Sequence, residues 1–151
     1  MKHDTPEQTR ERDERYRVRT KDHVARYVAT NGQDGYVESA LGATNLLLTT
    51  IGRRSGTAYT TPLNYAEHDG AYVIIASYEG SDTHPKWYLN IQANPNVTVQ
   101  ILGDRFAAVA REANGDEKAK LWPLLADRLP YFNRYQESTE RTIPLLVLDR
   151  K

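Results

Sequence analysis

The chain has 151 residues, and its 20 basic and 20 acidic side chains give a formal net charge of zero at pH 7. A single domain of this size buries about two-thirds of the surface of its unfolded chain, so it needs no disulfide staples. The sequence contains no cysteine, which excludes disulfides, thiolate metal sites and thiol nucleophiles, and the charge balance predicts no nucleic-acid partner.

A charged helix is predicted near the N-terminus, over residues 5–30. Thr5 is a candidate N-cap, and Pro6 suits the first helical turn. The apolar stripe of this segment is thin and consists of Val24, Tyr27 and Val28. We therefore expect a helix that packs weakly.

Positive charges gather in the second half of this predicted helix, at Arg17, Arg19, Lys21 and Arg26. Two interpretations stay open: a solvated face, which we favour, or peripheral contact with an acidic membrane surface. No apolar run has the length that a bilayer requires, and residues 1–7 lack the apolar stretch of a secretory signal. The sequence therefore predicts a cytoplasmic protein without a transmembrane segment.

The chain changes to short apolar segments after a break at residues 31–35, where Asn and Gly tolerate a left-handed backbone. We therefore expect a charged helical extension over residues 1–40 and one domain over residues 41–151. Six strand-like segments bounded by Gly, Asn, Asp or Pro lie in this domain: Leu46–Ile51, Ala58–Ala66, Ala71–Tyr78, Val97–Leu102, Arg105–Arg111 and Ile143–Leu148.

Turn signals at residues 67–70 and 103–104 predict hairpins and therefore antiparallel neighbours. Helices are predicted over residues 82–94 and 114–129, and a short aromatic segment over residues 130–136 precedes the last strand. The sequence thus predicts a mainly β, α+β fold, in which a β-barrel of about six antiparallel strands has flanking helices.

Two adjacent arginines, Arg53 and Arg54, follow a buried-looking strand and precede Ser55 and Gly56. Planar guanidinium groups bind phosphate or carboxylate through paired hydrogen bonds, so one interpretation is an anion clamp. The string Gly-Arg-Arg-Ser-Gly is also typical of a solvated hairpin turn. From these residues alone, both interpretations stay open.

The sequence holds neither a Gly-x-Ser-x-Gly nucleophile elbow nor a glycine-rich phosphate loop, which disfavours hydrolytic chemistry and the usual nucleotide sites. The four histidines are scattered, at His3, His23, His68 and His84. Exposed or capping positions account for them better than metal ligation does, so we predict no metal site.

Three polar segments beside the predicted strand ends are candidates for lining a ligand pocket. The first is Arg53–Gly56 with the following Tyr59–Asn64, in which Pro62 indicates a sheet edge or a bulge that exposes neighbouring backbone groups. The second is Ala76–Gly80, at the end of an apolar strand, and the third is Lys86–Asn90 on a predicted helix. Taken singly, each segment also has a structural explanation, since Trp87, for example, suits a core.

Five motifs follow one another between Leu46 and Leu148: Leu-Leu-Leu-Thr-Thr-x-Gly-Arg-Arg-Ser-Gly, Pro-Leu-Asn-Tyr, Ile-Ile-Ala-Ser, Pro-Lys-Trp-Tyr-Leu-Asn-Ile-Gln-Ala-Asn-Pro-Asn-Val and Tyr-Gln-x-x-Thr-x-Arg-x-Ile-Pro. This order resembles the family of deazaflavin-dependent nitroreductases and F420H2-dependent quinone reductases. The resemblance implies a split β-barrel related to FMN-binding proteins, with coenzyme F420 as the cofactor in preference to FMN. It leaves the first forty-odd residues outside.

The resemblance also implies a set of site residues. Arg53, Arg54 and Ser55 would hold the phosphate or acidic tail of the coenzyme. The deazaflavin and its side chain would be lined by Thr60, Thr61, Pro62, Leu63, Asn64, Ile75, Ala76, Ser77, Tyr78, Lys86, Trp87, Tyr88 and Asn90.

Ser77 and Tyr135 are the implied catalytic candidates, because they would stabilise negative charge on the electron acceptor. The acceptor itself would contact Asn64, Tyr131, Phe132 and Tyr135. The aromatic segment would form a lid over the acceptor; an alternative is an amphipathic helix that anchors the last strand.

The function implied by the resemblance is hydride transfer from reduced coenzyme F420 to an electron-poor small molecule, such as a quinone, an activated alkene or a nitro compound. Two alternatives remain: an FMN-dependent reductase, and a non-catalytic split barrel that binds F420 or lipid. Related split barrels often dimerise, so a homodimer is also a candidate state.

Overall fold

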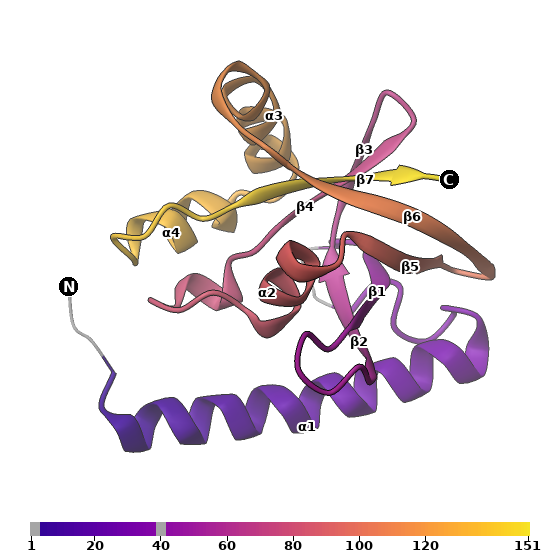
Figure 1. Cartoon of the computed structure of the whole chain (residues 1–151), viewed down its shortest axis with the longest axis horizontal. Helices are drawn as coiled ribbons and strands as arrows, with labels where there is room; N and C mark the ends of the chain where they lie inside the picture. The colour runs from indigo at the N-terminus through magenta and orange to yellow at the C-terminus, as the bar shows by residue number, and fades with distance from the viewer. Residues whose placement is uncertain (1–3, 39–41) are drawn as a thin grey trace.

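The computed structural model describes residues 4–38 and 42–151, which form one curled sheet with helices around it (Figure 1). Within these ranges all seven strands pair antiparallel. The elements in chain order are α1 (Pro6–Thr30), β1 (Asn45–Ile51), β2 (Ala58–Asn64), β3 (Ala66–His68), β4 (Ala71–Ile75), the 3-10 turn η1 (Tyr78–Gly80), α2 (Lys86–Ala93), β5 (Asn96–Ile101), β6 (Asp104–Ala113), α3 (Gly115–Arg128), α4 (Tyr131–Glu137) and β7 (Leu145–Arg150).

The sheet curls because one stretch of chain supplies both of its outer strands. The strand order is β2-β1-β5-β6-β7-β4-β3, and only Tyr65 separates β2 from β3 in the sequence. β2 pairs with β1 as far as Asn64, and β3 pairs with β4 from Ala66 onward. The two ends of the sheet are therefore covalently joined, which gives the predicted split β-barrel.

This join also explains the one difference in the strand count. The sequence predicts a single strand over Ala58–Ala66, but Tyr65 interrupts it and donates its backbone N–H to the carbonyl of Thr44 at 3.3 Å. The chain has to leave β1 at this point before it can reach β4. Seven strands result instead of about six, and Pro62 lies in an outer strand, where a missing N–H is tolerated.

The first four residues of β7 are buried on both faces of the sheet, which accounts for the uninterrupted apolar run in this strand. Leu146 and Leu148 pack in a cluster with Trp87 of α2, while Leu145 and Val147 pack in a second cluster with the helices α3 and α4. A strand that is covered on both sides has no need for apolar and polar residues to alternate. The core is therefore made of two layers that share the strands.

The helix boundaries agree with the sequence within a few residues. α2 begins at Lys86 rather than near residue 82, because Pro85 is still extended at ψ 149°. β4 ends at Ile75 rather than at Tyr78, because Tyr78 and Glu79 adopt left-handed backbone conformations with φ of 45° and 56°. The strand cannot continue through such a turn.

The long helix α1 lies along one side of the molecule, beneath β1 and β2 in the view of Figure 1. Thr5 and Gln8 form the capping box at its start, and Asn31 ends it with a left-handed φ of 50°. No helix in the described part of the chain is long and apolar enough to cross a membrane.

Only two side chains of α1 are buried, and the predicted apolar stripe is partly wrong. Val28 is 51% exposed, whereas His23 is buried and its Nε2 lies 2.7 Å from the carbonyl of Gly35. The Tyr27 hydroxyl is fully buried, donates to the Asn45 carbonyl at 2.9 Å and accepts from the Leu102 N–H at 2.9 Å. Tyr27 thus attaches this end of α1 to the barrel, while His23 bonds the turn that follows the helix.

We expect Tyr27→Phe to lower the free energy of unfolding by about 1–3 kcal/mol, because it leaves the Leu102 N–H without its acceptor. Urea unfolding followed by circular dichroism measures the change. The matched control is Tyr59→Phe, since Tyr59 is 54% exposed. Equal stability of the two variants would contradict the role of the Tyr27 hydroxyl.

Candidate active site

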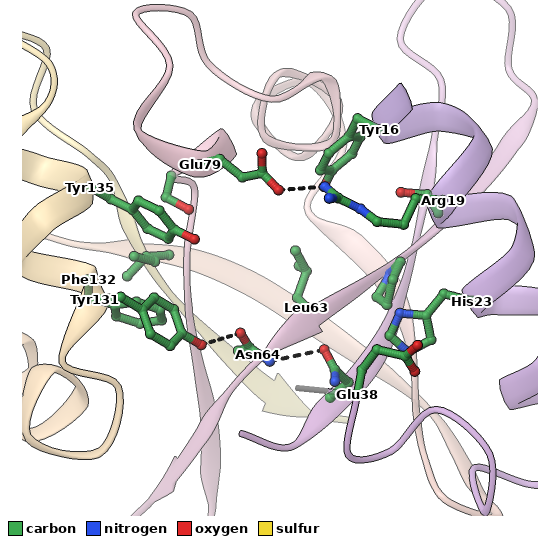
Figure 2. Close-up of a pocket in the computed structure, with 15 residues that line it drawn as sticks. Tyr16, Arg19, His23, Glu38, Leu63, Asn64, Glu79, Tyr131, Phe132 and Tyr135 are labelled. Atoms are coloured by element: carbon green, nitrogen blue, oxygen red, sulfur yellow. Dashed lines mark hydrogen bonds and ion pairs between the residues drawn. The ribbon is translucent and has the colours of Figure 1, made fainter. Parts of the chain in front are cut away.

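A cavity of about 270 Å³ lies between α1, β2 and α4 (Figure 2). In the view of Figure 2 the aromatic side chains of α4 face the polar side chains of α1, with Leu63 of β2 between them. Fifteen residues line the cavity: Tyr16, Arg19, Thr20, His23, Glu38, Asn45, Pro62, Leu63, Asn64, Ile75, Ser77, Glu79, Tyr131, Phe132 and Tyr135.

A row of hydrogen bonds orders one wall of the cavity. The Tyr131 hydroxyl donates to Oδ1 of Asn64, and Nδ2 of Asn64 donates to Oδ1 of Asn45 at 3.1 Å. The amide of Asn45 donates in turn to the carbonyl of Tyr36 at 3.3 Å. Because each amide has its partners, the orientation of Asn64 toward Tyr131 is fixed before any ligand arrives.

The aromatic wall presents neutral phenols at physiological pH. Burial raises the pKa of Tyr131 to about 12 and raises the pKa of Tyr135 from its usual value. The ring of Tyr131 packs edge-on against Phe132 at 5.3 Å and against Tyr135 at 5.5 Å. The wall therefore offers a flat apolar surface with hydroxyl groups that keep their protons.

The opposite wall comes from α1 and carries a cation. The guanidinium of Arg19 lies 5.6 Å from the centre of the Tyr16 ring and donates to the carboxylate of Glu79 (Figure 2). Burial raises the pKa of the Tyr16 hydroxyl, while the nearby Thr61 hydroxyl lowers it. This wall is more polar than the wall from α4.

The turn that carries Ser77 and Glu79 is strained and is held by Arg141. Left-handed conformations at Tyr78 and Glu79 are costly for residues with a side chain. The guanidinium of Arg141 donates to the carbonyls of Ala76 at 3.1 Å, Ser77 at 2.7 Å and Ser81 at 2.7 Å. Arg141 therefore positions this part of the cavity from outside it.

The cavity brings together eight of the residues that the resemblance implied, from four separate elements or turns. They are Pro62, Leu63, Asn64, Ile75, Ser77, Tyr131, Phe132 and Tyr135. These eight include all four predicted acceptor-binding residues and both predicted catalytic residues. Their role toward a ligand stays a prediction.

Four other predicted residues lie beside the cavity but are not among those that line it. The Thr60 hydroxyl bonds that of Thr49 at 2.7 Å across the β1–β2 hairpin, and the Thr61 hydroxyl is buried next to Tyr16. Ala76 is fully buried. The Tyr78 hydroxyl donates to Asp13 of α1, so Tyr78 reaches toward the helix.

The predicted residues of α2 lie mainly in the core. Trp87 is 7% exposed and Tyr88 is 5% exposed, and the Tyr88 hydroxyl donates to Glu112 of β6. Asn90 is buried as well, but it acts on the β1–β2 turn: its Oδ1 accepts the N–H of Arg53 at 3.2 Å and its Nδ2 donates to Thr50 at 3.1 Å. The core explanation considered for Trp87 thus agrees with its burial.

The arginine-rich stretch forms the exposed turn between β1 and β2, outside the cavity. Within the described residues, the side chains of Arg53 and Arg54 form no ion pair, and Lys86 forms none either. Lys86 lies one helical turn before Asn90 and therefore on the same face of α2, toward the arginine turn. Three cations without acidic partners thus gather around one turn and the first turn of a helix.

The cation cluster, meaning Arg53, Arg54 and Lys86, is separated from the cavity by part of β2. Five residues of chain lead from Thr57, where the turn ends, to Pro62 in the cavity wall. At about 3.3 Å per residue the two places are roughly 17 Å apart along the strand. A ligand that used both would have to be long, with its anionic part at the turn.

Six lining residues lie outside every pocket segment predicted from the sequence, and four of them carried a signal. Tyr16, Arg19, Thr20 and His23 are spaced three or four residues apart and so share one helical face. This face was interpreted as part of a solvated surface because it is polar. Asn45 and Glu38 had no comparable pattern, whereas Glu79 lies in the predicted segment Ala76–Gly80.

The sequence matches the F420H(2)-dependent quinone reductase family over residues 17–150. The chain belongs to this family. An F420H(2)-dependent quinone reductase of Mycobacterium tuberculosis is 36% identical over 133 residues, which cover 85% of this chain and 88% of that protein.

Two solved structures resemble this family member closely. One is an F420-H2 dependent reductase, FDR-A, with a TM-score of 0.65 and 37% identity, covering 70% of this chain and 93% of the other. The second is described as a domain-swapped dimer and has a TM-score of 0.67 and 33% identity, covering 85% and 96%. Both likenesses include the split barrel.

The family resemblance inferred from the five motifs is therefore confirmed, and with it an oxidoreductase that transfers hydride from reduced F420 to quinone-type acceptors. The family match begins at residue 17, well before the predicted start of the resemblance at Leu46. The second half of α1 is thus part of the matched region, which agrees with its place in the cavity wall.

We expect Arg141→Met to lower the free energy of unfolding by about 1.5–3 kcal/mol, because three backbone carbonyls lose their shared charged donor. It should also reduce quinone reduction, since Ser77 and Glu79 lose their support. Urea unfolding and initial rates measure the two effects. Arg134→Met, at an exposed position of α4, is the control and should change neither. A wild-type rate in Arg141→Met would exclude a positioning role.

Proposed function

We propose that this F420H2-dependent reductase binds its quinone-type acceptor in the cavity between α1, β2 and α4, with the coenzyme extending along β2 to the cation cluster. The observation that carries the proposal is the pairing of a cavity lined by neutral phenols with a separate cluster of unpaired cations. A ring system suits the first place, and an anionic tail suits the second.

The residues fit the coenzyme in chemistry and in size. Coenzyme F420 joins a flat deazaflavin ring to a tail with a phosphate and several glutamates, so it needs local cations on a protein with no net charge. Arg53, Arg54 and Lys86 supply them, and the first turn of α2 adds backbone N–H groups, since Pro85 provides no side-chain cap. The cavity of about 270 Å³ has room for a quinone ring, so the coenzyme lies beside this ring along β2 and not inside the cavity with it.

The cavity residues orient the reactants and exclude water. Phe132, Tyr131 and Leu63 provide flat apolar surface against which a ring can lie. The bound deazaflavin supplies a hydride, a two-electron reductant. Ser77 and Tyr135 stabilise the negative charge that develops on the acceptor, and the raised pKa of Tyr135 keeps its hydroxyl protonated for this purpose.

F420 is proposed in preference to FMN. FMN has one phosphate and no glutamate chain, and it would leave most of the cation cluster without a counter-charge. Two copies of the chain are also proposed to pair, supported by the relative described as a domain-swapped dimer.

Mixing the protein with reduced F420 and menadione tests the activity. We expect the visible absorbance of oxidised F420 to appear, at a rate that depends on both reactants. Reduced FMN in place of reduced F420 is the matched comparison; in the absence of oxygen, and after the rate without protein is subtracted, it should give a much lower rate. No oxidation with any quinone, together with no binding of F420 at micromolar concentrations, would end the proposal.

We expect the double change Arg53→Ala and Arg54→Ala to weaken F420 binding by about 1–3 kcal/mol at low salt, and by less at high salt, because the lost contacts are charge-assisted. Fluorescence titration with oxidised F420 measures the dissociation constant. Arg105→Ala, which removes an exposed arginine at the β5–β6 hairpin, is the control. An unchanged constant in the double variant would make the turn a solvated hairpin and nothing more.

A further inference from the structure

Arg19 is the one permanent cation among the described residues that line the cavity. The other basic lining residue is His23, whose Nε2 lies 2.7 Å from the Gly35 carbonyl and 3.5 Å from Glu38. The acidic lining residues are Glu38 and Glu79. Among the described residues, no other side chain therefore presents a permanent positive charge to a molecule in the cavity.

The Arg19 side chain is 63% exposed, and its contacts with Glu79 and Tyr16 leave most of its donors free. Nη2 donates to Glu79, and the Tyr16 ring lies under the guanidinium at 5.6 Å. Among the described residues, Nε and Nη1 of Arg19 have no hydrogen-bond partner. A guanidinium has five N–H groups in one plane, so those that remain can bind an oxygen atom without the side chain being reordered.

Glu79 is itself held in an unusual conformation that points it toward Arg19 (Figure 2). Its left-handed φ of 56° lies within the turn that Arg141 ties down through three carbonyls. Conformational strain of this kind persists where the surrounding structure enforces it, and it often marks a functional site. The ion pair between Arg19 and Glu79 therefore depends on a strained backbone conformation of Glu79, which Arg141 stabilises from outside the cavity.

We propose that Arg19 binds a carbonyl oxygen of the quinone and stabilises the negative charge that this oxygen gains during reduction, with Glu79 as the residue that positions Arg19. The proposal deepens the proposed function and rests on it for the placement of the acceptor. It adds a residue from α1 to a site that the motifs assigned to the barrel and α4.

The charge balance of the reaction explains why a cation is useful here. The C–H bond of the reduced coenzyme breaks and its electron pair moves with the hydrogen to the quinone, so the coenzyme is oxidised and the quinone is reduced to a hydroquinone monoanion. The coenzyme also loses its ring N–H proton to solvent, and the hydroquinone monoanion takes up one proton from solvent to become the neutral hydroquinone. A guanidinium at the oxygen stabilises the anion more than it stabilises the neutral quinone, and that difference lowers the barrier.

Binding of two naphthoquinones without coenzyme tests the contact directly. The probes are 2-hydroxy-1,4-naphthoquinone, which is ionised at neutral pH, and menadione, which carries a methyl group at the same position and is neutral. We expect Arg19→Met to weaken binding of the anion by about 10- to 100-fold in calorimetry, and binding of menadione by much less. Arg17→Met is the control, because Arg17 is exposed and pairs with Glu14 on the same helix. Equal affinities of Arg19→Met and the wild type for the anion would overturn the proposal.

Kinetics separate binding of the acceptor from stabilisation of the charge. With menadione and reduced F420, Arg19→Met should lower kcat by about 10-fold or more while KM changes little, and Arg19→Lys should recover part of the loss. Glu79→Gln should lower kcat by a smaller factor and leave the affinity for F420 unchanged, as a positioning residue would. An unchanged kcat in Arg19→Met would overturn the role.

The outcomes distinguish this inference from the proposed function. If the wild type binds the anion through Arg19 but does not oxidise reduced F420 with any quinone, the proposed function fails and the anion site stands. If the wild type turns over and Arg19→Met matches it in both kcat and anion binding, the proposed function stands and Arg19 has no part in it.

Discussion

One stretch of chain has to pair with both ends of the same sheet, and the remainder of the structure depends on how it does so. β2 and β3 would form one straight strand if Tyr65 did not turn the chain from β1 to β4. The turn leaves an edge of β2 without a neighbouring strand, and α1 lies along that side. The cavity is found at the same place because a helix cannot pack against a strand edge as closely as another strand does.

The two halves of α1 contact different parts of the molecule. Its second half is attached to the barrel through the buried hydroxyl of Tyr27, and the ring of His23 bonds the turn that follows the helix. Its first half reaches mainly the strained turn, where Arg12 and Tyr16 surround the ring of Tyr78. The helix thus links a rigid part of the barrel to the least regular part of the cavity, and Arg19 lies between the two.

Most of the fold could be predicted from the sequence because its signals are local. Gly, Asn and Pro mark the turns, and the capping box of Thr5 and the break at Asn31 bound α1 correctly. The division of a strand at Tyr65 could not be predicted, since it depends on which strands are neighbours in space. The left-handed pair Tyr78 and Glu79 was missed for a related reason, because neither residue type favours that conformation.

Only those cavity residues that lie in or beside the family motifs could be predicted from the sequence. The residues of β2 and α4 were found through the family resemblance, and they do meet in one cavity. The wall from α1 was missed because a polar helical face is usually solvated, and Arg19, whose side chain is itself 63% exposed, has no local feature that distinguishes it from its neighbours. Trp87 and Tyr88 belong to one of the motifs, but they are buried in the core and do not line the cavity. A family motif can therefore contain residues that pack the core and do not contact a ligand.

The cavity takes one wall from residues 16–23 and the other from residues 131–135, at opposite ends of the sequence. During synthesis on a ribosome, residues 16–23 therefore emerge long before residues 131–135, and the helix that carries them has little to pack against until then. A contact between such distant segments forms late, after the loops between them have closed. The cavity is consequently complete only in the finished chain, because a product that ends before residue 131 lacks both the wall from α4 and the strand β7 that joins β6 to β4.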